Sequence, residues 1–270
     1  HYEYDRNRRI NDRLKILSKV TPEDMKKLQN DNFNYRAYEI LPVMLDTLDT
    51  TSFKAREWKY YNMLESWDYF NEPELIAPTV FQMWWNILYK NIWDEFDTIS
   101  VAIDKPGHYN TVKLLQSNPG FKLFDILETP SKEDAIALYN MTFRMAVDSL
   151  TGMQEQGEDL RWYIFKNTSI NHLLRLSPFS SESVRIGGFG NTVNAAGGGH
   201  GPSWRMVVEL TEEGPQAWGV YPGSQTGNPG SPDYGHMIND WATGNYHKLT
   251  FGPNLANHPN ITFTQQIDPE

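Results

Sequence analysis

Two serines near the end of the chain stand among glycines, where a tight turn could present a hydroxyl nucleophile. Ser203 lies in the sequence Gly-Pro-Ser-Trp-Arg, in which Arg205 takes the place of the second glycine of a nucleophile elbow. Ser224 lies in Gly-Ser-Gln-Thr-Gly, one position too early for the same motif. No serine is followed by a lysine three residues later, as the β-lactamase signature requires. We therefore predict that neither serine is a nucleophile and that Ser203 begins a strand.

The histidines, acidic pairs and glycine runs match no motif for metal, sugar or phosphate chemistry. None of the seven histidines falls in an HExxH or HxxEH pattern, so a zinc peptidase has no support. The acidic pairs, such as Glu23-Asp24, lie at expected helix starts or exposed turns and do not indicate a two-carboxylate hydrolase. The run GGFGNTVNAAGGG lacks the Gly-Lys-Ser/Thr of a phosphate-binding loop and precedes a strand. We predict no metal ligands and no cofactor-binding residues in this chain.

Composition limits the classes of partner. The chain of 270 residues has 24 Lys and Arg against 34 Asp and Glu, a net charge of −10. This charge disfavours nucleic acid or an anionic membrane as the main partner, because both require a basic face. No apolar run approaches the roughly 20 residues of a membrane span. The absence of cysteine excludes disulfides and thiol chemistry, whereas 13% aromatic residues predict a packed aromatic core.

Helical periodicity and capping signals predict that residues 1–156 are mainly helical. Thr21-Pro22 with acids behind it has the cap and proline of a helix start. Pro42 is expected to kink its helix, and Ser131 is the expected cap of the last long one. Phe81, Trp85, Leu88 and Ile92 recur at helical spacing and predict a buried face. The predicted helices cover residues 4–19, 35–48, 55–69, 76–96 and 131–156.

Residues 157–270 are predicted to be a mainly strand region with glycine-rich loops. Of the 19 glycines, 13 fall between Gly187 and Gly235, where the backbone is expected to turn sharply or to pass close to another backbone. Residues 204–211 and 217–221 are predicted to form a hairpin, and a short helix is expected to end at Gly244. The other predicted strands are residues 161–166, 170–176 and 247–251. Without an internal repeat or a long linker, residues 1–270 are interpreted as one unit.

The glycine-rich tract contains a series of contiguous motifs: 190–195 (GNTVNA), 201–210 (GPSWRMVVEL), 222–232 (PGSQTGNPGSP), Tyr234, Trp241 and 244–249 (GNYHKL). In the order and spacing of these motifs, the tract resembles the C-terminal portion of the large (β) chain of penicillin acylases, which are N-terminal-nucleophile hydrolases. Weaker similarity upstream, including an Arg-x-x-Arg-Ile helix at Arg6 and a Leu-x-x-Trp-Asp motif at Leu64, extends the resemblance over nearly the whole chain.

This resemblance implies an α+β fold, the C-terminal part of an αββα sandwich, with a helical first half and a strand-rich second half. It implies hydrolysis of linear amide bonds in acylated small molecules, such as β-lactam side chains or N-acyl homoserine lactones. A serine at the start of the large chain attacks the carbonyl in this family, with its own α-amino group as base. A backbone N–H and an asparagine side chain hold the oxyanion. The resemblance also implies a processed, periplasmic or secreted precursor.

The sequence departs from the family pattern at its beginning. Its first residue is His1, which has no hydroxyl to activate, and the family's Asn-Trp-Asn motif is absent. We therefore expect a fragment that lacks nucleophile and oxyanion asparagine and is inactive alone. Its expected partners are the small chain, the N-terminal part of the large chain and an amide substrate; calcium ligands of the full protein would lie outside it.

One active-site residue of the family matches a position in this chain. The resemblance assigns Arg6 to an arginine that supports the oxyanion asparagine, while a surface helix arginine is the alternative interpretation. Substrate-binding residues are not indicated. A second hypothesis for the whole chain is a binding or scaffold module that reuses the fold without its chemistry, and its many tryptophans would suit a sugar or acyl-chain groove.

Overall fold

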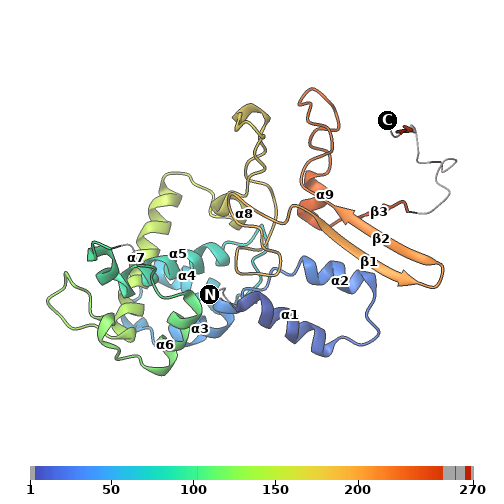
Figure 1. The fold of residues 1–270 in the computed structure, drawn as a ribbon. Helices are drawn as coiled ribbons and strands as arrows, with labels where there is room; N and C mark the ends of the chain where they lie inside the picture. The colour runs from blue at the N-terminus through green and yellow to red at the C-terminus, as the bar shows by residue number, and fades with distance from the viewer. Residues whose placement is uncertain (1–3, 102, 252–258, 260–264, 269–270) are drawn as a thin grey trace. The chain divides into compact units, whose positions relative to one another are not determined.

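The computed structural model describes residues 4–101, 103–251, 259 and 265–268 (Figure 1). Its contacts divide the chain into two compact units. Unit 1 comprises residues 1–18 and 28–202, and unit 2 comprises residues 19–27 and 203–270. Strand structure begins at Arg205, later than the expected onset at residue 157. The interpretation of residues 1–270 as one unit of a larger enzyme stays a prediction.

Unit 1 is a helical assembly around one aromatic core. The longest helices, α5 and α7, pack against each other, and Trp84 of α5 donates a hydrogen bond through Nε1 to Thr142 Oγ1 of α7 at 3.0 Å. Phe81, Trp85, Leu88 and Ile92 are fully buried, as their spacing predicts. The helices of this unit are α1 (Asp5–Ile16), α3 (Tyr35–Asp46), α4 (Ala55–Glu65), α5 (Ala77–Ile92), α6 (His108–Ser117), α7 (Ala135–Glu155) and α8 (Trp162–Lys166).

Two helices of unit 1, α3 and α7, begin at side chains that cap them. Asn34 caps α3, where its Oδ1 accepts the Ala37 amide at 3.1 Å. The cap of α7 is Asp134, whose Oδ1 accepts the Ala137 amide at 2.8 Å. The expected cap Ser131 was therefore wrong by three residues, because Ser131 Oγ instead donates to Glu133 Oε1 at 3.2 Å, just before the helix begins.

Two predicted strands of unit 1 were also wrong. Residues 161–166 form α8, in which the Phe165 amide donates to the Arg161 carbonyl at 3.0 Å and left-handed Asn167 (φ 49°) ends the helix. A short apolar run fits either structure, and local hydrogen bonds decide here for the helix. Residues 170–176 make only one antiparallel bridge, from Ile170 to Ser181.

Unit 2 contains an antiparallel sheet in the order β1-β2-β3, visible as arrows in Figure 1. The predicted hairpin is confirmed as β1 (Arg205–Thr211) and β2 (Gly214–Val220), and the last strand as β3 (His247–Leu249). α9 (Ile238–Thr243) ends at left-handed Gly244, as predicted. The expected helix start is confirmed in α2 (Pro22–Gln29), where the Thr21 amide donates to Asp24 Oδ2 at 3.0 Å.

The two faces of this sheet differ. On one face Val207 is 7% exposed, and the Lys26 ammonium of α2 lies over the Trp218 ring at 4.5 Å. On the other face the cross-strand neighbours of β1 are small or lack a side chain: Gly219, Ala217 and Pro215. A Cβ at Gly219 would lie 2.7 Å from the Trp204 ring, so a larger residue there would displace that ring. The apolar side chains that this second face leaves exposed are Trp204, Met206, Val208 and Leu210.

Candidate functional site

A buried carboxylate begins the helix that carries Arg6. Asp5 is the first residue of α1 and is 3% exposed. Its Oδ2 accepts a hydrogen bond from Asn191 Nδ2 at 3.2 Å and lies 3.9 Å from Nη2 of Arg36, which is also buried. The N-terminal end of a helix favours negative charge. A buried charge requires such partners, because desolvation without them costs several kcal/mol, by an order-of-magnitude estimate of about 3–5.

Three asparagines extend from this carboxylate. Asn34 Oδ1 accepts from Asn191 Nδ2 at 3.1 Å, and Asn34 Nδ2 donates to Asn71 Oδ1 at 3.4 Å. All three asparagines are buried. We call Asp5, Asn34, Arg36, Asn71 and Asn191 the buried polar centre. It joins the starts of α1 and α3 to the glycine-rich segment of residues 186–198.

A neutral histidine lies near Arg36 of the buried polar centre. Burial, together with the charge of Arg36, lowers the pKa of His108 to about 3. The unprotonated His108 Nδ1 accepts a hydrogen bond from Trp85 Nε1 at 3.1 Å. The Arg36 guanidinium lies 5.4 Å from the centre of the Trp85 ring. Arg36 therefore carries the positive charge in this region, while His108 acts as a hydrogen-bond acceptor.

Arg6 lies on α1 next to the buried polar centre, and its residue is exposed. The arginines that follow it have carboxylate partners. Arg8 makes two hydrogen bonds of 2.6 Å to Glu39, which raise its pKa, and Arg9 pairs with Asp31 at 2.7 Å. These ion pairs hold α1, whereas no ion pair joins Arg6 to a described residue. The role of Arg6 stays a prediction, and His1 lies outside the described residues.

The glycine-rich segment approaches its neighbours closely. Gly188 has a φ of +73°, and a Cβ there would lie 2.1 Å from the Asn194 carbonyl oxygen. The Gly188 amide donates to the Asn71 carbonyl at 2.9 Å. This agrees with the predicted close passage of backbones. The motif GNTVNA contains Asn191 and Asn194, and Asp5 directly precedes Arg6. Neither pattern predicts that these residues share one buried region with Asn34 and Arg36.

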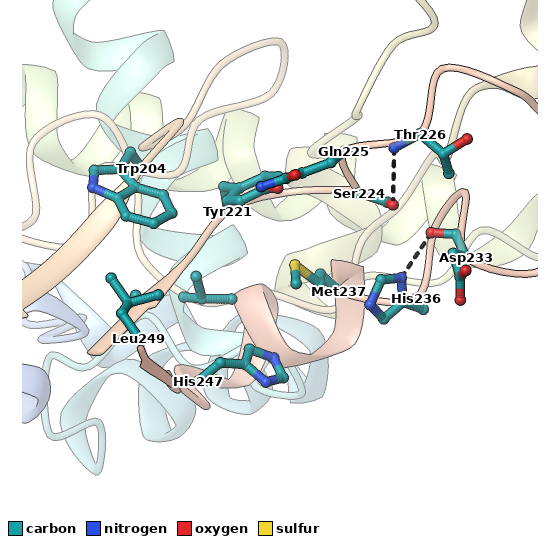
Figure 2. A pocket seen from close by; sticks show the side chains of 12 residues that line it. Trp204, Tyr221, Ser224, Gln225, Thr226, Asp233, His236, Met237, His247 and Leu249 are labelled. Atoms are coloured by element: carbon teal, nitrogen blue, oxygen red, sulfur yellow. Dashed lines mark hydrogen bonds between the residues drawn. The ribbon is translucent and has the colours of Figure 1, made fainter. Parts of the chain in front are cut away.

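Unit 2 has a pocket of about 510 Å³ beside the exposed sheet face (Figure 2). Trp204 and Tyr221 line it with ring centres 5.4 Å apart. His236 Nδ1 lies 2.7 Å from the Asp233 carbonyl oxygen, so that ring nitrogen carries the proton. Ser224 Oγ accepts the Thr226 amide at 3.2 Å. Figure 2 shows them as two separate hydrogen bonds, and no hydrogen bond joins Ser224 to a histidine in the described part of the pocket.

Among the described residues, no group of three or more His, Asp or Glu side chains is placed to hold a metal ion. No helix of the described chain is long and apolar enough to traverse a bilayer.

The family description "Penicillin amidase" matches residues 1–257, and the chain belongs to this family. It is 32% identical to the acyl-homoserine lactone acylase QuiP of Pseudomonas syringae pv. tomato, over 46% of this chain and 17% of that protein. It resembles the solved thermostable penicillin G acylase of Alcaligenes faecalis with a TM-score of 0.56 and 12% identity. That match covers 100% of this chain and 54% of the solved one, so the chain spans about half the length of that acylase and less of QuiP. The likeness supports the α+β fold.

Proposed function

We propose that this chain is the C-terminal part of the large chain of an acylase that hydrolyses linear amide bonds of acylated small molecules. The family match over residues 1–257 is the observation that carries the proposal. We assign the attacking hydroxyl, its amine base and the oxyanion asparagine to the rest of that acylase. This chain covers only 54% of the solved penicillin G acylase, which leaves room for such a remainder. The chain therefore requires that remainder for turnover.

Within this acylase, Arg6 supports the oxyanion asparagine. A guanidinium has five N–H donors in a rigid fork, which suits the orientation of a neighbouring amide oxygen. Asp5 and Arg36 fix the start of α1 and so the direction in which Arg6 projects. Arg6 acts on the reaction through the asparagine and is a positioning residue.

The substrate classes are acylated β-lactams and N-acyl homoserine lactones. The names of the two similar proteins, a penicillin G acylase and an acyl-homoserine lactone acylase, support these classes. Both substrates present a secondary amide between an apolar acyl group and a small polar ring. We further propose a periplasmic or secreted location, which rests on the family.

The partner of the chain is the remainder of the same precursor, which completes an αββα sandwich. A sheet with one apolar face uncovered needs a second layer to bury that face. Met206, Val208 and Leu210 are 45%, 42% and 86% exposed on β1, and β1 pairs with β2 alone among the described strands. We assign this face to the second sheet.

The test compares the complete precursor with this chain. A chromogenic phenylacetyl amide and a long-chain N-acyl homoserine lactone are the probes, and release of the free amine is measured. We expect turnover of at least one probe by the complete protein and none by residues 1–270 alone. Turnover by the chain alone, lost on substitution of one of its own residues, would contradict the missing-nucleophile argument. A complete protein that binds but never cleaves either amide would favour the binding-module hypothesis.

A further inference from the structure

Lys166, the last residue of α8, is a buried cation that the proposed chemistry does not use. The residue is 7% exposed, and burial lowers its pKa to about 7. Its Nζ donates to the carbonyl oxygens of Ile186, Gly187 and Ala196 at 2.9, 2.8 and 3.0 Å. An ammonium group has three N–H donors and no acceptor. The three carbonyls therefore satisfy it completely, and only its protonated form can serve all three.

These three acceptors lie at the two ends of the glycine-rich segment. Residues 186–187 enter the segment, and Ala196 lies where the chain leaves it. Two residues near Lys166 in the sequence bind the same two ends. Trp162 Nε1 donates to the Gly188 carbonyl and Thr168 Oγ1 to the Gly197 carbonyl, both at 2.8 Å. The ammonium thus joins the ends of the loop to each other and to α8.

The middle of the same segment binds the start of α1 and the residues just before α3. Asn191 contacts Asp5 and Asn34, as described above. Asn194 Nδ2 donates to Asn32 Oδ1 at 2.8 Å, and the Asn194 amide donates to the Asp31 carbonyl at 2.9 Å. The segment is therefore a bridge, held by Lys166 at its ends and bound to the start of α1 through its side chains.

We propose that Lys166 is a positioning residue whose ammonium sets the shape of residues 186–197 and thereby places Asn191 against Asp5, beside Arg6. Lysine suits this position better than arginine, since a planar guanidinium has five donors and could not converge on three carbonyls as a compact ammonium does. The effect on loop order stands by itself. Its effect on amide hydrolysis rests on the proposed function.

Hydrogen exchange tests the loop order. Lys166→Met keeps the length of the side chain and removes the charge and all three donors, leaving three buried acceptors without a partner. We expect about 5-fold to 150-fold faster exchange for amides of residues 187–197, which at 1.4 kcal/mol per tenfold corresponds to about 1–3 kcal/mol. Lys90→Met, an exposed lysine on α5, is the matched control and should leave these rates unchanged. Wild-type rates in Lys166→Met would overturn the proposal.

Chemical rescue separates the donors from the charge. Lys166→Ala removes three methylene groups and the ammonium, which n-propylammonium restores as a free ion. We expect n-propylammonium to slow exchange in residues 187–197 of this variant. Tetramethylammonium, which has the charge but no N–H, should not. Equal rescue by both ions would contradict the proposal.

Two further measurements cover the remaining outcomes. In the unmodified chain at pH 6, the Lys166 ammonium should give a ¹⁵N-correlated NMR signal, while exposed lysines lose theirs to exchange with water. Absence of the Lys166 signal contradicts the ammonium site even if the variants do not fold.

In the complete acylase, Lys166→Met should lower kcat about a hundredfold with KM within about twofold, and n-propylammonium should restore kcat in Lys166→Ala. Faster loop exchange with wild-type kcat contradicts the positioning role. Absence of amidase activity in the unmodified acylase contradicts the proposed function and not the loop order.

Discussion

The charged residues at the start of α1 differ in what they bind. Asp5 is turned inward and bound by Asn191, while Arg8 and Arg9 bind the carboxylates of Glu39 and Asp31. Arg6 is the exposed arginine between them. Among the described residues no ion pair holds the Arg6 guanidinium, in contrast to Arg8 and Arg9, and this agrees with the supporting role proposed for Arg6 in the oxyanion site.

Arg6→Ala in the complete acylase should therefore lower kcat by about tenfold to a hundredfold, because misplacement of an oxyanion donor costs rate more than binding. Steady-state kinetics with the phenylacetyl amide measure the effect. Lys15→Ala, an exposed position on the same helix, is the control. Equal kcat values for the two variants would assign Arg6 to the surface.

His108 predicts an acid sensitivity that can be measured in this chain. Its pKa of about 3 lies below its ordinary value of 6.5, so between these values the unfolded chain binds a proton that the native chain does not. The stability contributed by neutral His108 is complete above pH 6.5 and is lost as the pH falls toward 3, by at most about 1.4 kcal/mol per pH unit.

The urea midpoints of wild type and His108→Asn at pH 7.0, 5.5 and 4.5 test this expectation. The asparagine oxygen can still accept from Trp85 and does not titrate, so the variant should lose less stability on acidification. His200→Asn, at an exposed histidine, should follow the wild type. Parallel curves for wild type and His108→Asn would refute the assignment.

Among the secondary-structure elements, helix α7 depends on the cap at its N-terminal end. α7 packs along α5 through the aromatic core, and its first turn depends on Asp134. Asp134→Ala should lower the free energy of unfolding by about 1 kcal/mol, the usual cost of losing an N-cap. Ser131→Ala, the position that the sequence favoured, should cost less, because its hydroxyl binds a partly exposed glutamate. Chemical denaturation of both variants measures the difference, and a larger loss for Ser131→Ala would contradict the observed cap.

The whole molecule is expected to need a partner. Met206, Val208 and Leu210 expose apolar side chains along one face of the edge strand β1, and such a face favours association with another chain. Light scattering of residues 1–270 should show association that increases with concentration. The double variant Met206→Lys, Val208→Lys should reduce it, whereas Glu209→Lys, on the opposite face of the strand, should not. A clean monomer for the unmodified chain at all concentrations would contradict this expectation.

Local patterns were sufficient for much of the fold. The capped start of α2, the buried stripe of α5, the hairpin and the glycine stop of α9 each depend on neighbours within a few residues, which the sequence displays directly. The resemblance in residues 190–249 likewise identified the family, since its motifs are contiguous. α8 was missed because a five-residue apolar run has no period that separates helix from strand.

Long-range contacts were decided by tertiary structure alone. Asp5 and Asn191 are 186 residues apart, and nothing in the composition or spacing of either segment pairs them. Lys166 gave no signal in the sequence, because its three partners are backbone carbonyls, which every residue possesses. The sequence determines which residues prefer helix, strand or turn, whereas only the folded chain decides which buried polar groups satisfy one another, because that choice depends on distances between segments remote along the chain.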